Sequence, residues 1–208
     1  MTRTIHALGN IVNAQKRLTA EQAEQILQLA KPIFDNAVAK QFKTGHGVVP
    51  VDDYINNLVG EIAELWEAYR CQKLSSACDK EAFIKEEGED RRLTCAEEEM
   101  ADIVIRACDQ LWDLAGDGYD ALEFGDWLYL KGVPDDLGCS AFIKEATRRA
   151  IQIDDHESTA HRESMLFSII WLCCLHAAEF DVPDLLAAAK AKHQFNTNRP
   201  IRHGGKIA

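Results

Sequence analysis

The sequence is poor in the two residues that interrupt helices, with only five prolines and 12 glycines among 208 residues. No alternation of apolar and polar residues persists long enough to predict a sheet, and no internal repeat is visible. Because 47% of the residues are hydrophobic, the chain can fill the core of one compact domain. We therefore expect an all-α helical bundle that forms a single domain over residues 1–208.

Several motifs of nucleotide, metal and redox chemistry are missing. The sequence has no GxxxxGK[ST] loop and no GxGxxG after a strand. Its seven cysteines are an odd number and include no CxxC pair, so no zinc or redox framework is indicated. We expect reduced, mostly buried thiols. Cys173 and Cys174 lie beside His176, but their apolar surroundings favour a core position over a metal or nucleophile site.

Positive charge is also scarce, with 23 Lys and Arg against 34 Asp and Glu and a formal net charge of −11. This balance disfavours nonspecific binding to nucleic acid or to anionic membranes. The N-terminus lacks the apolar core of a secretory signal. Residues 165–178 are apolar but shorter than the roughly 20 residues of a membrane span, which predicts a buried bundle helix. We expect a cytoplasmic protein without a nucleic-acid or membrane partner.

Two acidic pairs at helical spacing are the most informative feature that is present: Glu61 with Glu64, and Glu99 with Asp102. A step of three residues keeps both carboxylates of a pair on neighbouring parts of one helix surface. Two facing helices could therefore bring four carboxylates together. Such a cluster repels itself unless cations fill it, and magnesium is commonly held by a few carboxylates together with substrate phosphates. The spacing indicates a magnesium site and phosphate chemistry.

A single acidic pair more often belongs to a solvated helix surface, since the chain has 34 acidic residues. The apolar pattern favours the metal site. Over residues 54–69 and 100–114, apolar side chains recur near the helical period, and the first acid of each pair borders that stripe. A carboxylate there would be partly desolvated without a cation. A di-iron bundle is the rival interpretation, but it needs Glu-x-x-His, which none of the seven histidines completes.

Residues 60–70, GEIAELWEAYR, and 98–106, EEMADIVIR, resemble the MazG-like all-α nucleoside triphosphate pyrophosphohydrolases, whose signature is ExxE followed by ExxD. The resemblance implies a helical bundle that hydrolyses NTP or dNTP to NMP or dNMP and pyrophosphate, as in nucleotide house-cleaning. It implies a homodimer or homotetramer. Magnesium is the implied cofactor, with Mn²⁺ as a substitute. The implied metal ligands are Glu61, Glu64, Glu99 and Asp102.

Residues 192–206 resemble the closing segment of the same family, which implies phosphate contacts from Lys192, Asn196 and Arg199. Lys192 and Asn196 are one helical turn apart and Arg199 follows within another, so the three could converge on one anion. A basic tail taken alone is more often solvated. Glu98, next to the ligands, is a candidate catalytic acid or water-orienting base; its alternative is a charge favoured by the helix N-terminus.

Five main helices are expected, with a shorter one at 141–150. Capping boxes are expected at Thr19 with Gln22 and at Thr94 with Glu97. Segments 72–93 and 117–160 exceed the family pattern and are expected insertions. The five expected helices run from Thr19 to about Lys43, from Asp52 or Asp53 to about Cys71, from Thr94 to Ala115, from Ser164 to Glu179, and from the Asp181–Pro183 cap to near Asn196.

A non-catalytic helical module that binds a nucleotide or a partner remains the alternative function.

Overall fold

The computed structural model describes residues 25–47, 49–85, 88–115, 137–153 and 158–199, which are predominantly helical. A 3-10 helix, η3 (Ala177–Phe180), continues α7, and two short strands, β1 (Phe83–Ile84) and β2 (Arg91–Arg92), pair antiparallel. The expected all-α fold is confirmed. Six α-helices lie in the described ranges: α2 (Ala30–Ala39), α3 (Val51–Arg70), α4 (Cys95–Ala115), α6 (Cys139–Ile151), α7 (Thr159–His176) and α8 (Leu185–Asn198).

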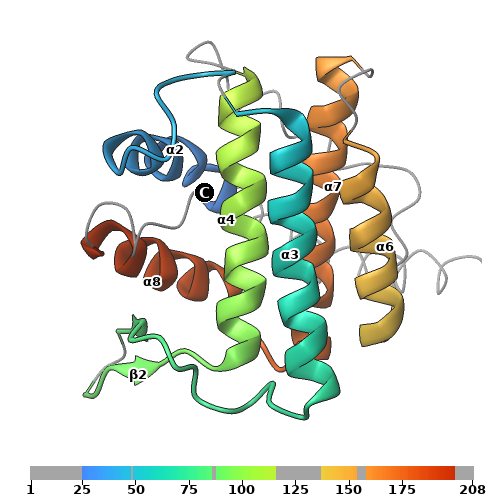
Figure 1. The fold of residues 1–208 in the computed structure, drawn as a ribbon. Coiled ribbons are helices and arrows are strands. Elements are labelled where there is room, and N and C mark those ends of the chain that lie inside the picture. The colour runs from blue at the N-terminus through green and yellow to red at the C-terminus, as the bar shows by residue number, and fades with distance from the viewer. Residues whose placement is uncertain (1–24, 48, 86–87, 116–136, 154–157, 200–208) are drawn as a thin grey trace, which may run out of the picture.

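Helix α4 is the centre of the bundle, because it packs against α2, α3, α7 and α8. Helices α3, α4, α6 and α7 run side by side, whereas α2 and α8 cross on one side of α4 (Figure 1). The strand pair lies beyond α8 at the end where α4 begins (Figure 1). The two helices that carry the acidic pairs, α3 and α4, are therefore direct neighbours.

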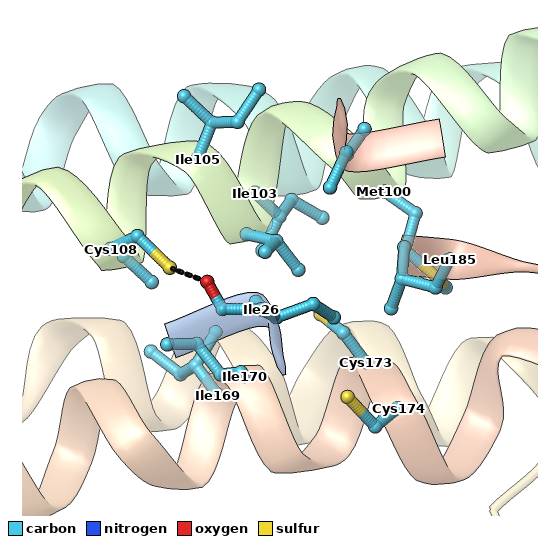
Figure 2. Packing of buried hydrophobic residues seen from close by; sticks show 14 of the residues in the cluster. Ile26, Met100, Ile103, Ile105, Cys108, Ile169, Ile170, Cys173, Cys174 and Leu185 are labelled. Atoms are coloured by element: carbon cyan, nitrogen blue, oxygen red, sulfur yellow. Dashed lines mark hydrogen bonds between the residues drawn. The ribbon is translucent and has the colours of Figure 1, made fainter. Parts of the chain in front are cut away.

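The core follows the apolar spacing of the sequence. All described helices contribute to one hydrophobic cluster. Figure 2 shows Ile26 lying between Ile103 of α4 and Ile170 of α7, where the Cys108 thiol donates to the Ile26 carbonyl at 3.7 Å. Burial of one such large apolar side chain contributes about 1.5–3 kcal/mol. The apolar stripe predicted on α4 is fully buried at Met100, Ile103, Val104, Ala107 and Leu111.

Helix α7 contains the apolar segment predicted as a bundle helix. The stretch Thr159–Phe180 is long and apolar enough to cross a membrane, yet 56% of its apolar window is buried inside the protein. It packs against α4 and α6, as a core helix does. Cys173, Cys174 and His176 are all buried there, and burial raises the pKa of the Cys173 thiol. The core position predicted for this group is confirmed.

The capping box at the start of α4 is confirmed. The Thr94 amide donates to Glu97 Oε2 at 2.9 Å, and the Glu97 amide donates to Thr94 Oγ1 at 3.2 Å. Arg91 adds a bidentate ion pair to the same carboxylate, at 2.7 and 2.8 Å. This cap fixes where α4 begins, and with it the height of Glu99 and Asp102 in the bundle.

Several other helix limits differ from the prediction. Helix α7 begins at Thr159 rather than Ser164, because the Ser158 side chain caps it by accepting from the His161 amide at 3.3 Å. It ends at His176, where η3 continues to Phe180.

The first helix ends at Ala39 rather than near Lys43, because Gln41 takes a left-handed φ of 61°. Turn residues also interrupt it just before α2, at 28–29. The expected capping box at Thr19 lies outside the described residues.

Helices α3 and α8 begin at caps other than those expected. Pro50 is the N-cap of α3, so Asp52 and Asp53 lie in its first turn, where acidic side chains favour the helix dipole. Asp184 caps α8 by accepting from the Ala187 amide at 2.9 Å. Asp181 instead ends η3 with a left-handed φ of 59°.

The two segments expected as insertions pack on the bundle in different ways. In 72–93, the antiparallel bridge of Ala77 with Thr94 and the strand pair hold the connection against the start of α4. In 117–160, the expected short helix is α6, which packs against α3 and α7 as a full member of the bundle. Residues 116–136 and 154–157 lie outside the described ranges.

Candidate functional site

A cleft of about 360 Å³ lies between α2, α3, α4 and α8. Each helix contributes side chains three or four positions apart, which is the spacing that places them on one surface. On α3 these are Asn57, Glu61 and Glu64, and on α4 they are Asp102, Ile105, Arg106 and Asp109.

The structure brings three of the four predicted metal ligands into one group. Carboxylate oxygens of Glu61, Glu99 and Asp102 all lie within 4.8 Å of one another. The side chains of Glu61 and Asp102 are only 13% and 12% exposed. Glu64 lines the same cleft, but it is exposed and lies outside this close group. This position agrees with the helical spacing, which turns Glu64 about 60° farther from the core than Glu61.

The acid cluster carries negative charge that the described side chains balance only in part. The pKa of Glu99 is raised to about 8: burial is the main cause, Lys80 acts to lower it, and Asp102, Glu64 and Glu98 add to the rise. Burial and Asp102 also raise the pKa of Glu61, against the opposing effect of Arg106. Glu99 Oε2 is buried and has no hydrogen-bond partner. A buried, unpaired carboxylate oxygen beside two further carboxylates fits a hard divalent cation such as magnesium.

Three basic side chains provide the partial balance. The Lys192 ammonium lies 2.5 Å from Glu98 Oε1 and 2.6 Å from Asp102 Oδ2. The Lys80 ammonium lies 2.6 Å from the same Glu98 oxygen, and Arg106 Nε donates to Glu61 at 3.0 Å. Burial acts to lower the pKa of Lys192, but Asp102 and Glu98 together raise it above its ordinary value. Lys192 is therefore a charged lysine inside the protein.

The three residues predicted to contact phosphate all line the cleft. Their side chains are not equally available to an anion. Lys192 is buried in its two ion pairs, whereas the Arg199 guanidinium lies over the Phe195 ring, 5.2 Å from its centroid. The Lys40 ammonium donates to the Arg199 carbonyl and so ties the end of α8 to α2. Asn196 and Arg199 thus form the edge of the cleft, with Lys192 deeper beside the acids.

Glu98, the predicted acid or base, is fully buried and is not among the residues that line the cleft. Burial raises its pKa, although Lys192 acts in the opposite direction. Its Oε1 atom forms ion pairs with the ammonium groups of both Lys80 and Lys192, and its Oε2 atom has no hydrogen-bond partner. In this geometry Glu98 positions Lys80 and Lys192 beside Asp102.

Lys80 is one of the site residues that the sequence analysis did not identify. It comes from the connection 72–93, and its side chain lines the cleft while remaining 38% exposed. The Cys78 amide donates to the Leu93 carbonyl at 2.9 Å, which holds this stretch next to the first turn of α4. No local motif marks Lys80, because its position depends on that long-range pairing.

A second polar network lies at the α2 end of the cleft. The buried Lys43 ammonium is 2.8 Å from Asp109 Oδ2 and donates to the Tyr54 hydroxyl at 3.0 Å. The Tyr54 hydroxyl donates in turn to Asp113, whose other oxygen accepts from the Gly47 amide at 2.7 Å. Burial, followed by the Asp113 hydrogen bond, raises the pKa of Tyr54. The sequence analysis did not identify this network.

Comparison of the chain with protein-family models, with curated proteins and with solved structures gave no match in any of the three.

Proposed function

We propose that this protein is a magnesium-dependent nucleoside triphosphate pyrophosphohydrolase that converts NTP or dNTP to NMP or dNMP and pyrophosphate. The observation that carries the proposal is the group formed by Glu61, Glu99 and Asp102, in which a buried Glu99 oxygen has no partner. The likeness of the ExxE and ExxD segments to the MazG-like family supports the same reaction. That family membership remains part of the proposal.

The cleft has acidic residues that suit a metal ion and basic and amide residues that suit phosphate oxygens, as a bound triphosphate requires. Magnesium bound at the acids would draw in phosphate oxygens and polarise the attacking water. Glu61, Glu99 and Asp102 would hold the cation, and Glu64 lines the same cleft with an exposed side chain. Asn196 and Arg199 at the edge of the cleft donate to phosphate oxygens. The role of Glu98 as a water-orienting base stays a prediction. Its full burial favours a different role, in which Glu98 positions the two lysines.

Lys80 and Lys192 have separate tasks in this proposal. Lys192 is 2% exposed and stays with Glu98 and Asp102, where it keeps the acid cluster compact. Lys80 is 38% exposed and bonds the same Glu98 oxygen, so it can leave that oxygen and meet the triphosphate without exposing an unpaired acid. The connection 72–93 thereby supplies a phosphate contact that the two acidic motifs lack.

A panel of nucleoside and deoxynucleoside triphosphates, incubated with magnesium and followed by chromatography, tests the proposed reaction. We expect turnover of at least one triphosphate, and loss of that turnover when the metal is chelated. Absence of turnover across the whole panel would reject the enzyme and leave the nucleotide-binding or partner-binding module.

Replacement of Lys80 by Met tests its proposed phosphate contact. We expect KM for the triphosphate to rise about tenfold, as for loss of one charged hydrogen bond, with a smaller change in kcat. Lys73→Met, at an exposed position of the same connection, is the matched control. Equal KM values for the two variants would remove Lys80 from the proposed site.

The homodimer or homotetramer rests mostly on the resemblance, the house-cleaning role rests on it alone, and the cytoplasmic location rests on the sequence; all three remain predictions. Light scattering distinguishes an oligomer from a monomer of 23.3 kDa.

A further inference from the structure

The end of the cleft away from the acid cluster has the composition of a small-molecule pocket. Apart from Lys40 and Arg106, which also line the cleft, the wall there has four apolar residues, two amides and one carboxylate, a mixture typical of sites that orient one ligand. Asp109 lies two helical turns beyond Asp102 on α4, a rise of about 10 Å. The residues that line this end are Ile33, Asn36, Ala37 and Phe42 from the α2 side, Asn57 from α3, and Ile105 and Asp109 from α4.

One carboxylate oxygen of Asp109 is paired within the protein, and the other has no hydrogen-bond partner. Its Oδ2 atom lies 2.8 Å from the Lys43 ammonium, and Lys43 is itself 3% exposed. Its Oδ1 atom is buried and has no hydrogen-bond partner. An acceptor in that state costs free energy, which a donor on a ligand would recover. Because the Asp109 side chain forms part of the cleft wall, a small shift that keeps Oδ2 on Lys43 can present the other oxygen to a ligand.

We infer that this end of the cleft binds the base of a nucleotide and that Asp109 accepts a hydrogen bond from an exocyclic amino group of that base. The inference rests on the proposed function for the nucleotide itself. With phosphates at the acid cluster, the two helical turns to Asp109 match the span from the phosphates to the base. The substrate class is then nucleotides of cytosine and adenine, in preference to their keto counterparts uracil and hypoxanthine. A keto oxygen in the same place would face a carboxylate with no proton between them.

Because Lys43 fixes one oxygen of Asp109, a single substitution at Asp109 should reverse the preference for amino over keto bases. Lysine can only donate hydrogen bonds, so in Asp109→Asn the new amide oxygen must face Lys43. The amide NH₂ group then faces the base and donates where the wild-type carboxylate accepts. The variant should therefore favour the keto base of each pair.

The experiment compares kcat/KM for dCTP with dUTP, and for ATP with ITP, with magnesium. In parallel, calorimetry without magnesium measures binding of dCMP and dUMP. For the wild type we expect the amino base to be preferred about 10- to 100-fold, the effect of one charge-assisted hydrogen bond. In Asp109→Asn we expect the preference to disappear or to invert. Asp113→Asn is the control, because it removes one negative charge near Lys43, at 3.9 Å, from a residue that does not line the cleft.

Each outcome separates this inference from the proposed reaction. Turnover without an amino preference, or equal changes of preference in Asp109→Asn and Asp113→Asn, would overturn the inference and leave the reaction standing. Selective binding of dCMP that depends on Asp109, with no hydrolysis of any triphosphate, would support the inference and reject the enzyme. Neither binding nor hydrolysis would overturn both.

Discussion

Replacement of Glu99 by Gln should abolish magnesium-dependent turnover while raising the stability of the metal-free protein. Glu99 belongs to the close carboxylate group, and its Oε2 atom is buried without a partner. Loss of a side chain that only supports a metal ligand typically costs 10–100-fold in affinity or activity, so loss of a ligand should cost more than about 100-fold. A neutral amide also removes the desolvation cost of this buried carboxyl, the main cause of its raised pKa, together with its repulsion with Asp102, Glu64 and Glu98.

Thermal unfolding with and without magnesium measures both effects. Magnesium at 100 times its Kd would stabilise the wild type by about 2.7 kcal/mol, and the variant by much less. Glu67→Gln is the control, since Glu67 lies on α3 with a side chain that is 57% exposed. Normal turnover in Glu99→Gln, or the same magnesium stabilisation as in the wild type, would reject Glu99 as a ligand.

Replacement of Lys192 by Met should strongly destabilise the protein in the absence of magnesium. Lys192 is 2% exposed and forms ion pairs with both Glu98 and Asp102, at 2.5 and 2.6 Å. Removal of one partner of a buried ion pair costs about 3–5 kcal/mol, because the other charge is left unpaired. Lys80 remains close to Glu98, so we expect the lower end of that range. For a chain of this length the loss corresponds to a fall in Tm of about 6–12 °C.

Urea unfolding of Lys192→Met and Lys190→Met provides the comparison. Lys190 is exposed on the same helix, α8, so its variant tests the effect of the methionine alone. Magnesium should restore part of the lost stability of Lys192→Met, because the cation binds Asp102 in place of the ammonium. Equal stability of the two variants would contradict the structural role given to Lys192.

The helical period explains how much of the site could be predicted. The apolar stripe fixes the orientation of α4, and the capping box at Thr94 fixes its start, so the height and direction of Glu99 and Asp102 follow from local sequence. The same period indicates that Glu64 turns farther outward than Glu61, which is where the structure places it. The two acidic pairs come together because α3 and α4 pack as neighbours.

The basic partners of the acids could not be predicted in the same way. Lys192 meets Glu98 across 94 positions of sequence, and no pattern within α8 distinguishes a lysine that pairs with acids from one that awaits phosphate. Lys80 depends on the pairing of 77 with 94, and Lys43 on the end of the first helix at Ala39. These positions result from tertiary contacts between segments whose local preferences are weak.

Phosphorus NMR of the reaction products tests the central claim most directly. The wild-type protein, magnesium and the best triphosphate of the panel should yield equal amounts of nucleoside monophosphate and pyrophosphate, because the bond between the α- and β-phosphates is broken. The same mixture with Glu99→Gln should show neither product. Release of nucleoside diphosphate and orthophosphate by the wild type, or pyrophosphate formation that persists in Glu99→Gln, would contradict the account.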